Sequence, residues 1–327
     1  MVTQNEPLSV GSGTVSSTYE KVHLALDWLN QRIVGQEALT KKLTIALICG
    51  GHLLVEGAPG LAKTRAIKEL SRCIEGDFHR IQFTPDLLPS DVTGTEIYRP
   101  ETGSFHFQQG PIFHNLVLAD EVNRAPAKVQ SALLEAMAER QVTVGRETFH
   151  LPRLFLVMAT QNPIEQEGTY PLPEAQLDRF LMHVLIDYPP ANQERAILQL
   201  AREEFGNVDQ PSPVELSESE ILGIRDELGE LHMAEPVEKY IIDLVAHSRS
   251  GLEGVEYAAS PRATIALDQC SRTIAWLAGR DYVVPEDVLE IIHDVLRHRL
   301  ILSFEAEAQG TTTDDIIDTM IDQVPLT

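Results

Sequence analysis

Short apolar runs alternate with amphipathic segments over the first 190 residues of this 327-residue chain. Two amphipathic segments, 19–30 and 36–48, have the apolar spacing of helices and are separated by a short turn. Runs rich in apolar or β-branched residues, short enough to be buried strands, lie at 53–55, 79–83, 116–119, 155–159 and 183–186. Apolar strands separated by helices predict a parallel sheet in an α/β, three-layer αβα domain.

After residue 190 the pattern changes, and only helical periodicity remains. The expected helices lie at 193–204, 218–228, 237–247, 262–278 and 286–300, and residues 311–327 form a short acidic helix or a tail. Pro236, Pro261 and Pro285 stand at or near helix starts, where a missing N–H is harmless. This pattern predicts a second, all-helical domain.

Proline-rich punctuation at 189–190 and 210–213 marks the hinge between the two domains. We therefore expect a flexible tail at 1–18, the αβα domain at 19–190, a linker with the first helix at 191–213, and the helical domain at 214–327.

Composition is that of an ordinary globular chain, with 43% hydrophobic and 23% charged residues. The three cysteines, Cys49, Cys73 and Cys270, have no paired spacing, which favours a reducing compartment. Residues 1–18 lack the pattern of a signal peptide, and the longest apolar stretch, 43–55, is broken by Gly50, Gly51 and His52. We expect a cytoplasmic protein without membrane insertion.

The net charge is −23, from 49 acidic and 26 basic residues. Such a balance works against binding a phosphate backbone, so a nucleic-acid partner is not expected. Plain solubility explains the acidity, and a basic protein partner is the alternative.

The segment 53–64 has the layout of a phosphate-binding loop, because an apolar run enters a Gly-Pro turn that is followed by Lys-Thr and a helix. Lys63 would reach the β- and γ-phosphates, and the Thr64 hydroxyl would bind Mg²⁺. A chance Gly-Pro turn before a helix is the alternative. The residues expected to bind nucleotide here are Gly57, Ala58, Pro59, Gly60, Leu61, Ala62, Lys63 and Thr64.

Two further expectations concern the backbone near this loop. Ala62 stands where the motif usually has glycine, which is acceptable if that residue has right-handed helical geometry; Gly57 and Gly60 supply the freedom of the turn. The turn at Val34, Gly35 and Gln36, between the first two helices, is a place against which an adenine could lie.

The run 116–119 ends in paired carboxylates, Asp120 and Glu121. The carboxyl ends of parallel strands share one edge of a sheet, so this pair is expected beside the phosphate-binding loop. Asp120 would hold Mg²⁺ directly or through water, and Glu121 would orient and polarise the attacking water. Either carboxylate could instead cap the next helix.

Asn162 follows the next apolar run, where its neutral amide can hydrogen-bond a γ-phosphate or the lytic water. In isolation Asn162 would be an ordinary turn residue. Its place at the tip of a core strand distinguishes it.

Five motifs taken together resemble the MoxR family of AAA+ ATPases, in the clade with a helix-2 insert. They are Gly57 to Thr64, Leu118 to Ala125 around Asp120 and Glu121, Asn162, Leu177-Asp178-Arg179-Phe180, and Ala259-Ser260-Pro261-Arg262-Ala263. The resemblance covers nearly the whole chain.

The resemblance implies an αβα nucleotide-binding core, a helical lid, ATP and Mg²⁺ as cofactors, and a homo-oligomeric ring, usually a hexamer, with ATP between subunits. Asn162 corresponds to sensor 1, Arg179 to the arginine finger and Arg262 to sensor 2. Arginine suits a phosphoryl transition state because its planar guanidinium can donate two hydrogen bonds at once to phosphate oxygens. Surface or interdomain ion pairs are the alternative for both arginines. Whether Arg262 acts on its own subunit, and what Arg124 does, stay open.

Two strand-turn-strand patterns, near 93–109 and 141–150, resemble the insertions of this clade, which the family uses toward the centre of the ring. Ordinary surface decoration is the alternative. In a DNA motor these hairpins would carry several basic residues. Here Glu96, Arg99 and Glu101 sum to about −1, and Arg146 cancels Glu147, so nucleic-acid translocation is the weaker interpretation.

Three functions therefore remain open. The first is a chaperone-like ATPase ring that remodels a protein client or helps insert a metal or cofactor, beside a partner with a von Willebrand factor A domain. The second is a DNA or RNA translocase or helicase. The third is a nucleotide-binding scaffold without turnover, against which Lys63 and Glu121 argue.

Overall fold

The computed structural model describes residues 17–163, 168–204 and 211–326. The expected N-terminal tail at 1–18 therefore lies outside the described residues except for its last two positions. Gln210 of the expected hinge lies outside them as well.

A five-stranded parallel sheet forms the centre of the first domain, with the strand order β2-β5-β8-β1-β9. Its strands are β1 (Leu53–Glu56), β2 (Phe78–Gln82), β5 (Leu116–Asp120), β8 (Leu156–Gln161) and β9 (Met182–Leu185). All five strands agree with the predicted runs to within two residues at each end. The apolar runs are strands because both faces of the sheet are covered, and every residue of β5 is buried.

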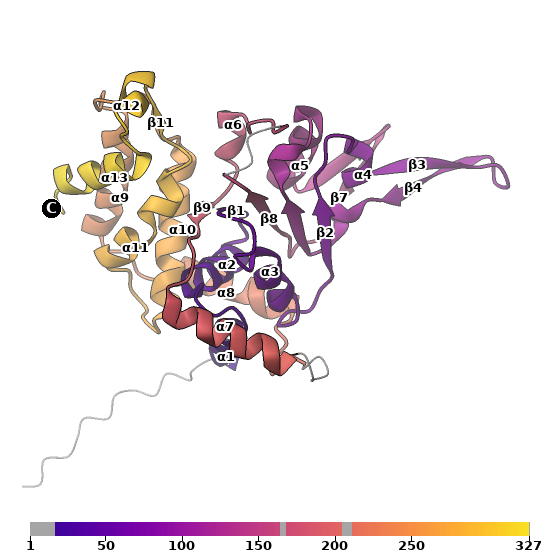
Figure 1. Ribbon diagram of the computed structural model, residues 1–327, viewed down its shortest axis with the longest axis horizontal. Helices are drawn as coiled ribbons and strands as arrows, with labels where there is room; N and C mark the ends of the chain where they lie inside the picture. Colours follow the sequence, from indigo (N-terminus) through magenta and orange to yellow (C-terminus); the bar gives the residue numbers. More distant parts are fainter. Residues whose placement is uncertain (1–16, 164–167, 205–210, 327) are drawn as a thin grey trace, which may run out of the picture.

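Helices cover the two faces of this sheet. Leu53 and Val55 of β1 belong to the core shared with α1 (Ser17–Arg32), α2 (Glu37–Cys49) and α3 (Lys63–Ser71). Leu54 points the other way, into the core shared with α5 (Ala127–Glu139). The predicted three-layer αβα domain is confirmed (Figure 1). Short helical elements connect the layers: α4 (Pro89–Thr93), η1 (Pro111–Phe113), η2 (Val122–Arg124) and α6 (Glu174–Leu177).

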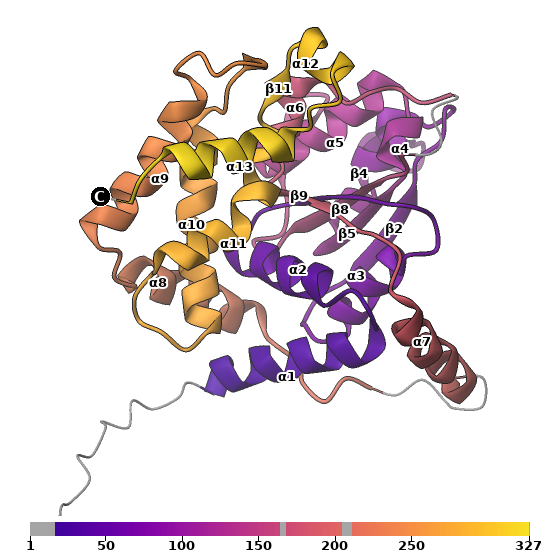
Figure 2. The ribbon, with the colours of Figure 1, turned by 60° about the vertical axis from the view of Figure 1, so that its left-hand side comes forward.

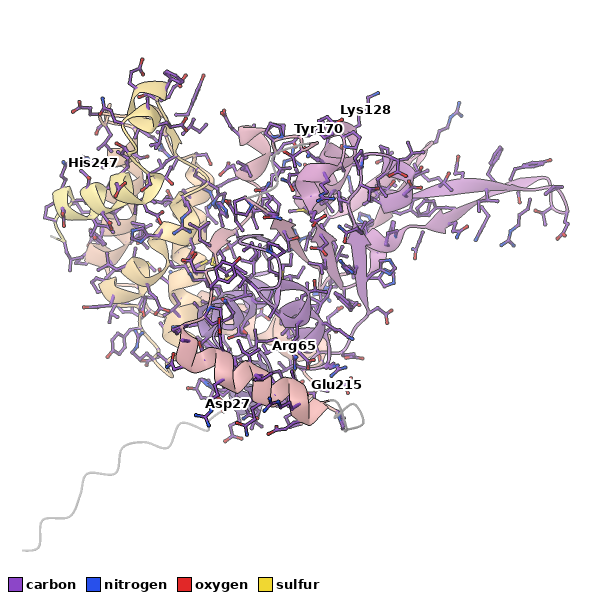
Figure 3. The ribbon with its side chains drawn as sticks, in the orientation of Figure 1. Asp27, Arg65, Lys128, Tyr170, Glu215 and His247 are labelled. Carbon is purple, nitrogen blue, oxygen red and sulfur yellow. The ribbon has the colours of Figure 1, made fainter. Side chains whose placement is uncertain are left out.

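Both predicted hairpins are present as antiparallel pairs. The first joins β3 (Gly94–Arg99) to β4 (Ser104–Gln109), and the second joins β6 (Gln141–Val144) to β7 (Glu147–His150). The two hairpins contact each other through the rings of Phe107 on β4 and Phe149 on β7, which stack with centroids 4.0 Å apart. The β3–β4 hairpin projects well away from the domain, with its side chains extending from both sides (Figures 1 and 3).

The C-terminal part is helical, as predicted, and packs beside the sheet domain (Figure 2). Its elements are α8 (Glu218–Glu230), α9 (Glu235–Ser248), β10 (Val255–Tyr257), α10 (Pro261–Leu277), α11 (Pro285–Leu296), β11 (Ile301–Leu302), α12 (Phe304–Ala308) and α13 (Thr313–Gln323).

The helix expected at 286–300 ends four residues earlier than predicted. It ends at Leu296, because the chain must then turn to pair β11 with β10. In that turn the side chains of His298 and Arg299 both contact the carbonyl of Phe180 in the sheet domain, at 3.1 and 2.7 Å. Periodicity alone did not show where tertiary contacts would end the helix.

Helix α7 (Ala191–Glu204) lies apart from helices α9 to α13, on the other side of α2 and α3 (Figure 2). Almost all of its described side chains are exposed. Of the helices formed by described residues, none is long and apolar enough to cross a bilayer.

Candidate nucleotide-binding site

The turn between β1 and α3 has a backbone that corrects one expectation. Ala62 lies immediately before α3 with φ of 57° and ψ of 17°, in the left-handed region rather than the expected right-handed one. Gly60 also has a positive φ, 86°. The chain reverses direction between a strand and a helix within a few residues, and this turn requires positive φ at both positions.

Gly57 is needed for a different reason from the one expected. It does not lie at positive φ, but a Cβ added to it would stand 2.4 Å from Cγ1 and 2.6 Å from the carbonyl oxygen of Ile186. Only glycine permits this close approach of the loop to the segment after β9.

Lys63, the first residue of α3, spans the loop. Its ammonium group donates hydrogen bonds to the carbonyl oxygens of Gly57 and Gln161, at 2.6 and 3.2 Å. Burial lowers the pKa of Lys63, while the negative charges of Asp120, Glu121 and Glu56 act in the opposite direction. The amine is thus held at the mouth of the loop by neutral acceptors that an anion can replace.

A cavity of about 330 Å³ opens above this loop. It is lined by the loop, by the start of α3 including Arg65 (Figure 3), and by the ends of β5 and β8. Of the residues expected at the site, it brings together Pro59, Gly60, Leu61, Ala62, Lys63, Thr64, Asp120, Glu121 and Asn162. The loop and the strand tips are neighbours because β8 lies between β1 and β5 in the sheet.

Asp120 is buried and has a partner on each carboxylate oxygen. Its Oδ1 accepts a hydrogen bond from the Thr160 hydroxyl at 2.6 Å. Its Oδ2 accepts bonds from Nε and Nη2 of Arg80 on β2, at 3.0 and 2.6 Å. The Asp120 side chain is therefore oriented by β8 and β2 as well as by its own strand.

Glu121 has a left-handed backbone, with φ of 57°. Its N–H donates to the Thr160 hydroxyl at 2.9 Å, which holds this conformation. Its Oε2 accepts a hydrogen bond from Gln82 at 2.8 Å and forms an ion pair with Arg124 at 3.0 Å. The carboxylate lines the cavity and is positioned by side chains from two elements.

Three of these partners, Arg80, Gln82 and Thr160, were missed from the sequence. Arg80 and Gln82 are two residues apart on β2, so they project from the same face of the strand. The strand was recognised, but only the parallel pairing of Gln82 with Asp120 shows that it lies beside the carboxylates. Thr160 lies between the predicted strand at 155–159 and Asn162 and received no role.

The two expected arginines do not line this cavity. Arg179 and Arg262 line another one, of about 280 Å³, at the joint between the sheet domain and α10. Arg179 donates to the carbonyl of Leu134 at 2.7 Å, and Arg262 lies 3.9 Å from a carboxylate oxygen of Asp178. The structure thus brings the two arginines together with each other, apart from the loop of the same chain.

The turn at Val34, Gly35 and Gln36 also lies outside the lining of the loop cavity. Gln36 is buried and donates to the carbonyl of Asp187 at 2.9 Å. A Cβ added at Gly35 would meet the side chains of Gln193 and Pro189 at 2.8 and 2.9 Å. The turn therefore packs against the segment that leads into α7.

The donors in the loop cavity suit magnesium. Within the described part of the chain, no three His, Cys, Asp or Glu side chains form a metal-binding group. Mg²⁺ commonly takes one or two protein oxygens together with water and phosphate oxygens. The Thr64 hydroxyl and the Asp120 carboxylate line the same cavity and supply oxygens of this kind.

The fold and this cavity define a P-loop nucleotide-binding protein with a helical lid. In agreement, residues 52–182 match the family described as ATPase family associated with various cellular activities (AAA), and residues 253–320 match the AAA lid domain.

Relatives cover almost the whole chain. Chaperone MoxR1 of Mycobacterium tuberculosis is 41% identical over 97% of this chain and 85% of the relative. Protein MoxR of Paracoccus denitrificans is 31% identical over 84% of this chain and 87% of the relative. The crystal structure of a putative ATPase from Cytophaga hutchinsonii superposes with a TM-score of 0.86 at 45% identity, covering 95% of this chain and 96% of that one. The chain belongs to the MoxR family of AAA+ ATPases.

Proposed function

We propose that this protein hydrolyses ATP to ADP and phosphate in a Mg²⁺-dependent reaction. One observation carries the proposal: Lys63, Thr64, Asp120, Glu121 and Asn162 line a single cavity. A phosphate-binding amine, two oxygen ligands, a carboxylate base and a neutral amide are the groups that phosphoryl transfer to water needs.

Each residue has a distinct part in the proposed reaction. The loop amides and the N-terminus of α3 bind the phosphates, and Lys63 exchanges its two carbonyl partners for phosphate oxygens. Thr64 and Asp120 would hold Mg²⁺, which neutralises phosphate charge when bound. Glu121 accepts a proton from the attacking water, and Asn162 hydrogen-bonds the γ-phosphate or that water.

We further propose that the protein acts as a homo-oligomeric ring of the hexameric kind that the family resemblance implies, with ATP between subunits. The separation of the Arg179 and Arg262 cavity from the loop cavity supports this, because within one chain neither arginine lines the loop cavity. Both arginines would then serve a neighbouring subunit's ATP. Val34, Gly35 and Gln36 would contact the adenine at the edge of the same site.

The biological role we propose is chaperone-like remodelling of a protein client, or metal or cofactor insertion, in the cytoplasm and beside a von Willebrand factor A domain partner. The printed name of the relative Chaperone MoxR1 supports a chaperone role. No observation on the described residues favours the DNA or RNA motor.

Two substitutions test the proposed reaction. Lys63→Ala removes the phosphate-binding amine and should abolish binding of a fluorescent ATP analogue. Glu121→Gln keeps the shape and the hydrogen bonding but loses the base, so ATP should still bind while turnover falls by about 10²-fold or more. Steady-state phosphate release measures turnover.

The matched control is Glu135→Gln, an identical change at an exposed position of α5. It should keep the rate of the unmodified protein. A Glu121→Gln protein with that same rate would remove Glu121 from the role of base.

A further inference from the structure

Both carboxylate oxygens of Asp120 have a hydrogen-bond partner, and Oδ2 carries more donors than Oδ1. Thr160 engages Oδ1, and Arg80 places two N–H donors on Oδ2, at 3.0 and 2.6 Å. An ionised carboxylate oxygen offers about two lone-pair positions. The Arg80 guanidinium therefore takes both positions of the oxygen that it contacts.

Arg80 and Thr160 differ in how readily each could leave. Thr160 is 1% exposed and also accepts the Glu121 N–H, so its hydroxyl is held from two sides. The Arg80 side chain is 48% exposed and lies on β2, one of the two edge strands of the sheet. Oδ2 is therefore the oxygen that can be opened, and Arg80 is the partner that can move into solvent.

Arg80 is nevertheless held in place by a second bond. Its Nη2 also donates to Oε1 of Gln82 at 2.7 Å, and the amide nitrogen of Gln82 donates to Glu121. Hydrogen bonds therefore connect four side chains in sequence, from Asp120 through Arg80 and Gln82 to Glu121. Gln82 therefore contacts both the partner of Asp120 and Glu121.

We propose that Arg80 is a displaceable internal counter-ion of Asp120, a positioning residue that competes with the divalent cation for Oδ2. This inference rests on the proposed function, in which Asp120 holds Mg²⁺. Arg80 would leave Oδ2 when a divalent cation binds, because two positive groups at one oxygen repel each other. Arg80 then sets the Mg²⁺ requirement of nucleotide binding, and its departure removes a bond that orients Gln82.

The test measures how strongly Mg²⁺ assists nucleotide binding. The dissociation constant of a fluorescent ADP analogue is determined for the full chain in EDTA and in Mg²⁺. The ratio of the constant in EDTA to the constant in Mg²⁺ is then compared between variants. ADP avoids turnover, so the readout does not depend on activity. In Arg80→Gln the ratio should rise about three- to fivefold, because the competitor is gone and the bare carboxylate repels phosphate when metal is absent.

Two further variants test the mechanism. Arg80→Lys keeps the positive charge but loses the paired N–H donors of the guanidinium, so it should give an intermediate ratio. Gln82→Leu, which frees Arg80 from its second bond, should raise the ratio about twofold, and the double variant should not exceed Arg80→Gln alone, since both changes act on one contact. Arg153→Gln, the same loss of charge at an exposed loop position, should leave the ratio unchanged.

An unchanged or lower ratio in folded Arg80→Gln and Arg80→Lys proteins would overturn the inference, since Arg80 would then remain in place when the metal binds. Thermal melting establishes that each variant is folded. Failure of the unmodified protein to bind the analogue in Mg²⁺ would instead overturn the proposed function, so the two failures are distinguishable.

Discussion

Ala62 and Glu121 are non-glycine residues with left-handed backbones, and both line the cavity. For an L-residue this conformation costs about 1–2 kcal/mol. Such strain persists where neighbouring bonds hold it, as the Thr160 hydroxyl holds the Glu121 N–H at 2.9 Å. At these two positions the chain favours the geometry of the site over local stability.

Ala62→Gly should stabilise the nucleotide-free protein. Glycine adopts φ of 57° without the Cβ clash, which stabilises the folded state by about 1 kcal/mol. The greater conformational freedom of glycine in the unfolded chain offsets about half of that gain. We expect a net gain of about 0.5 kcal/mol in the free energy of unfolding, measured in urea. In Ala66→Gly, within the buried right-handed part of α3, the same measurement should show a loss of about 1 kcal/mol or more. A loss at Ala62 as well would contradict the strain assigned to it.

His52 makes stability depend on pH. Burial lowers the pKa of this imidazole to about 4; its Nδ1 accepts the Val157 N–H at 3.0 Å, and its Nε2 donates to the Met137 carbonyl at 3.3 Å. Since the unfolded chain binds a proton near pH 6.5 and the folded chain does not until about pH 4, stability is lost as the pH falls through this window.

Between pH 7 and pH 5 this effect should remove about 2 kcal/mol from the free energy of unfolding. The loss should be absent from His52→Gln and retained in His106→Gln, an exposed control, when both are unfolded in urea at the two pH values. An equal pH dependence in His52→Gln would show that another group is responsible.

At the scale of elements, the joint between sheet domain and lid depends on Asp178. Its Oδ1 accepts a bond from Arg299 at 2.8 Å, and its Oδ2 accepts one from the Ser260 hydroxyl, also at 2.8 Å, at the start of α10. Only 3% of the Arg299 side chain is exposed. Burial lowers the pKa of Arg299, and the Asp178 charge opposes that effect.

Asp178→Ala should therefore destabilise the protein by about 3 kcal/mol, because it leaves a buried guanidinium without its counter-ion. Asp178→Asn keeps an acceptor and should cost less. Asp243→Ala, which removes an exposed pair with Lys239 at 3.8 Å, should change the free energy of unfolding by less than about 0.5 kcal/mol. Urea unfolding followed by circular dichroism compares the three, and similar losses at positions 178 and 243 would contradict this account.

The elements also show which patterns can be read without coordinates. Pro261 and Pro285 occupy the first positions of α10 and α11, as their missing N–H predicts. The end of α11 and the roles of Arg80 and Gln82 could not be predicted from the sequence. Each depends on which distant segment of the chain lies beside it in the fold.

At the scale of the whole molecule, the loop cavity and the arginine cavity are separate in one chain. If ATP lies between subunits, a complete site needs the loop of one copy and the arginine of another. Two defective proteins with damage on opposite sides of the site should then complement each other.

Arg179→Ala alone should bind nucleotide and lose hydrolysis, while Lys63→Ala should lose binding. An equal mixture that exchanges subunits should recover activity at about a quarter of its sites, the random frequency of an intact loop facing an intact arginine. Phosphate release measures the recovery, and native mass spectrometry verifies mixed assemblies. Lys63→Ala mixed with Glu121→Gln, both damaged on the loop side, is the control without recovery. Mixed assemblies with no recovery in the first mixture would count against a shared site.

The sequence by itself determined the strands, most of the helices, both hairpins and the family, because burial on two faces and a loop that binds phosphate each impose a local residue pattern. Tertiary structure alone decided the left-handed backbone at Ala62, the grouping of Arg179 with Arg262, and the contact of Arg80 with Asp120. The physical reason is distance along the chain: Arg80 and Asp120 are forty residues apart, and only the pairing of β2 with β5 brings their charges together.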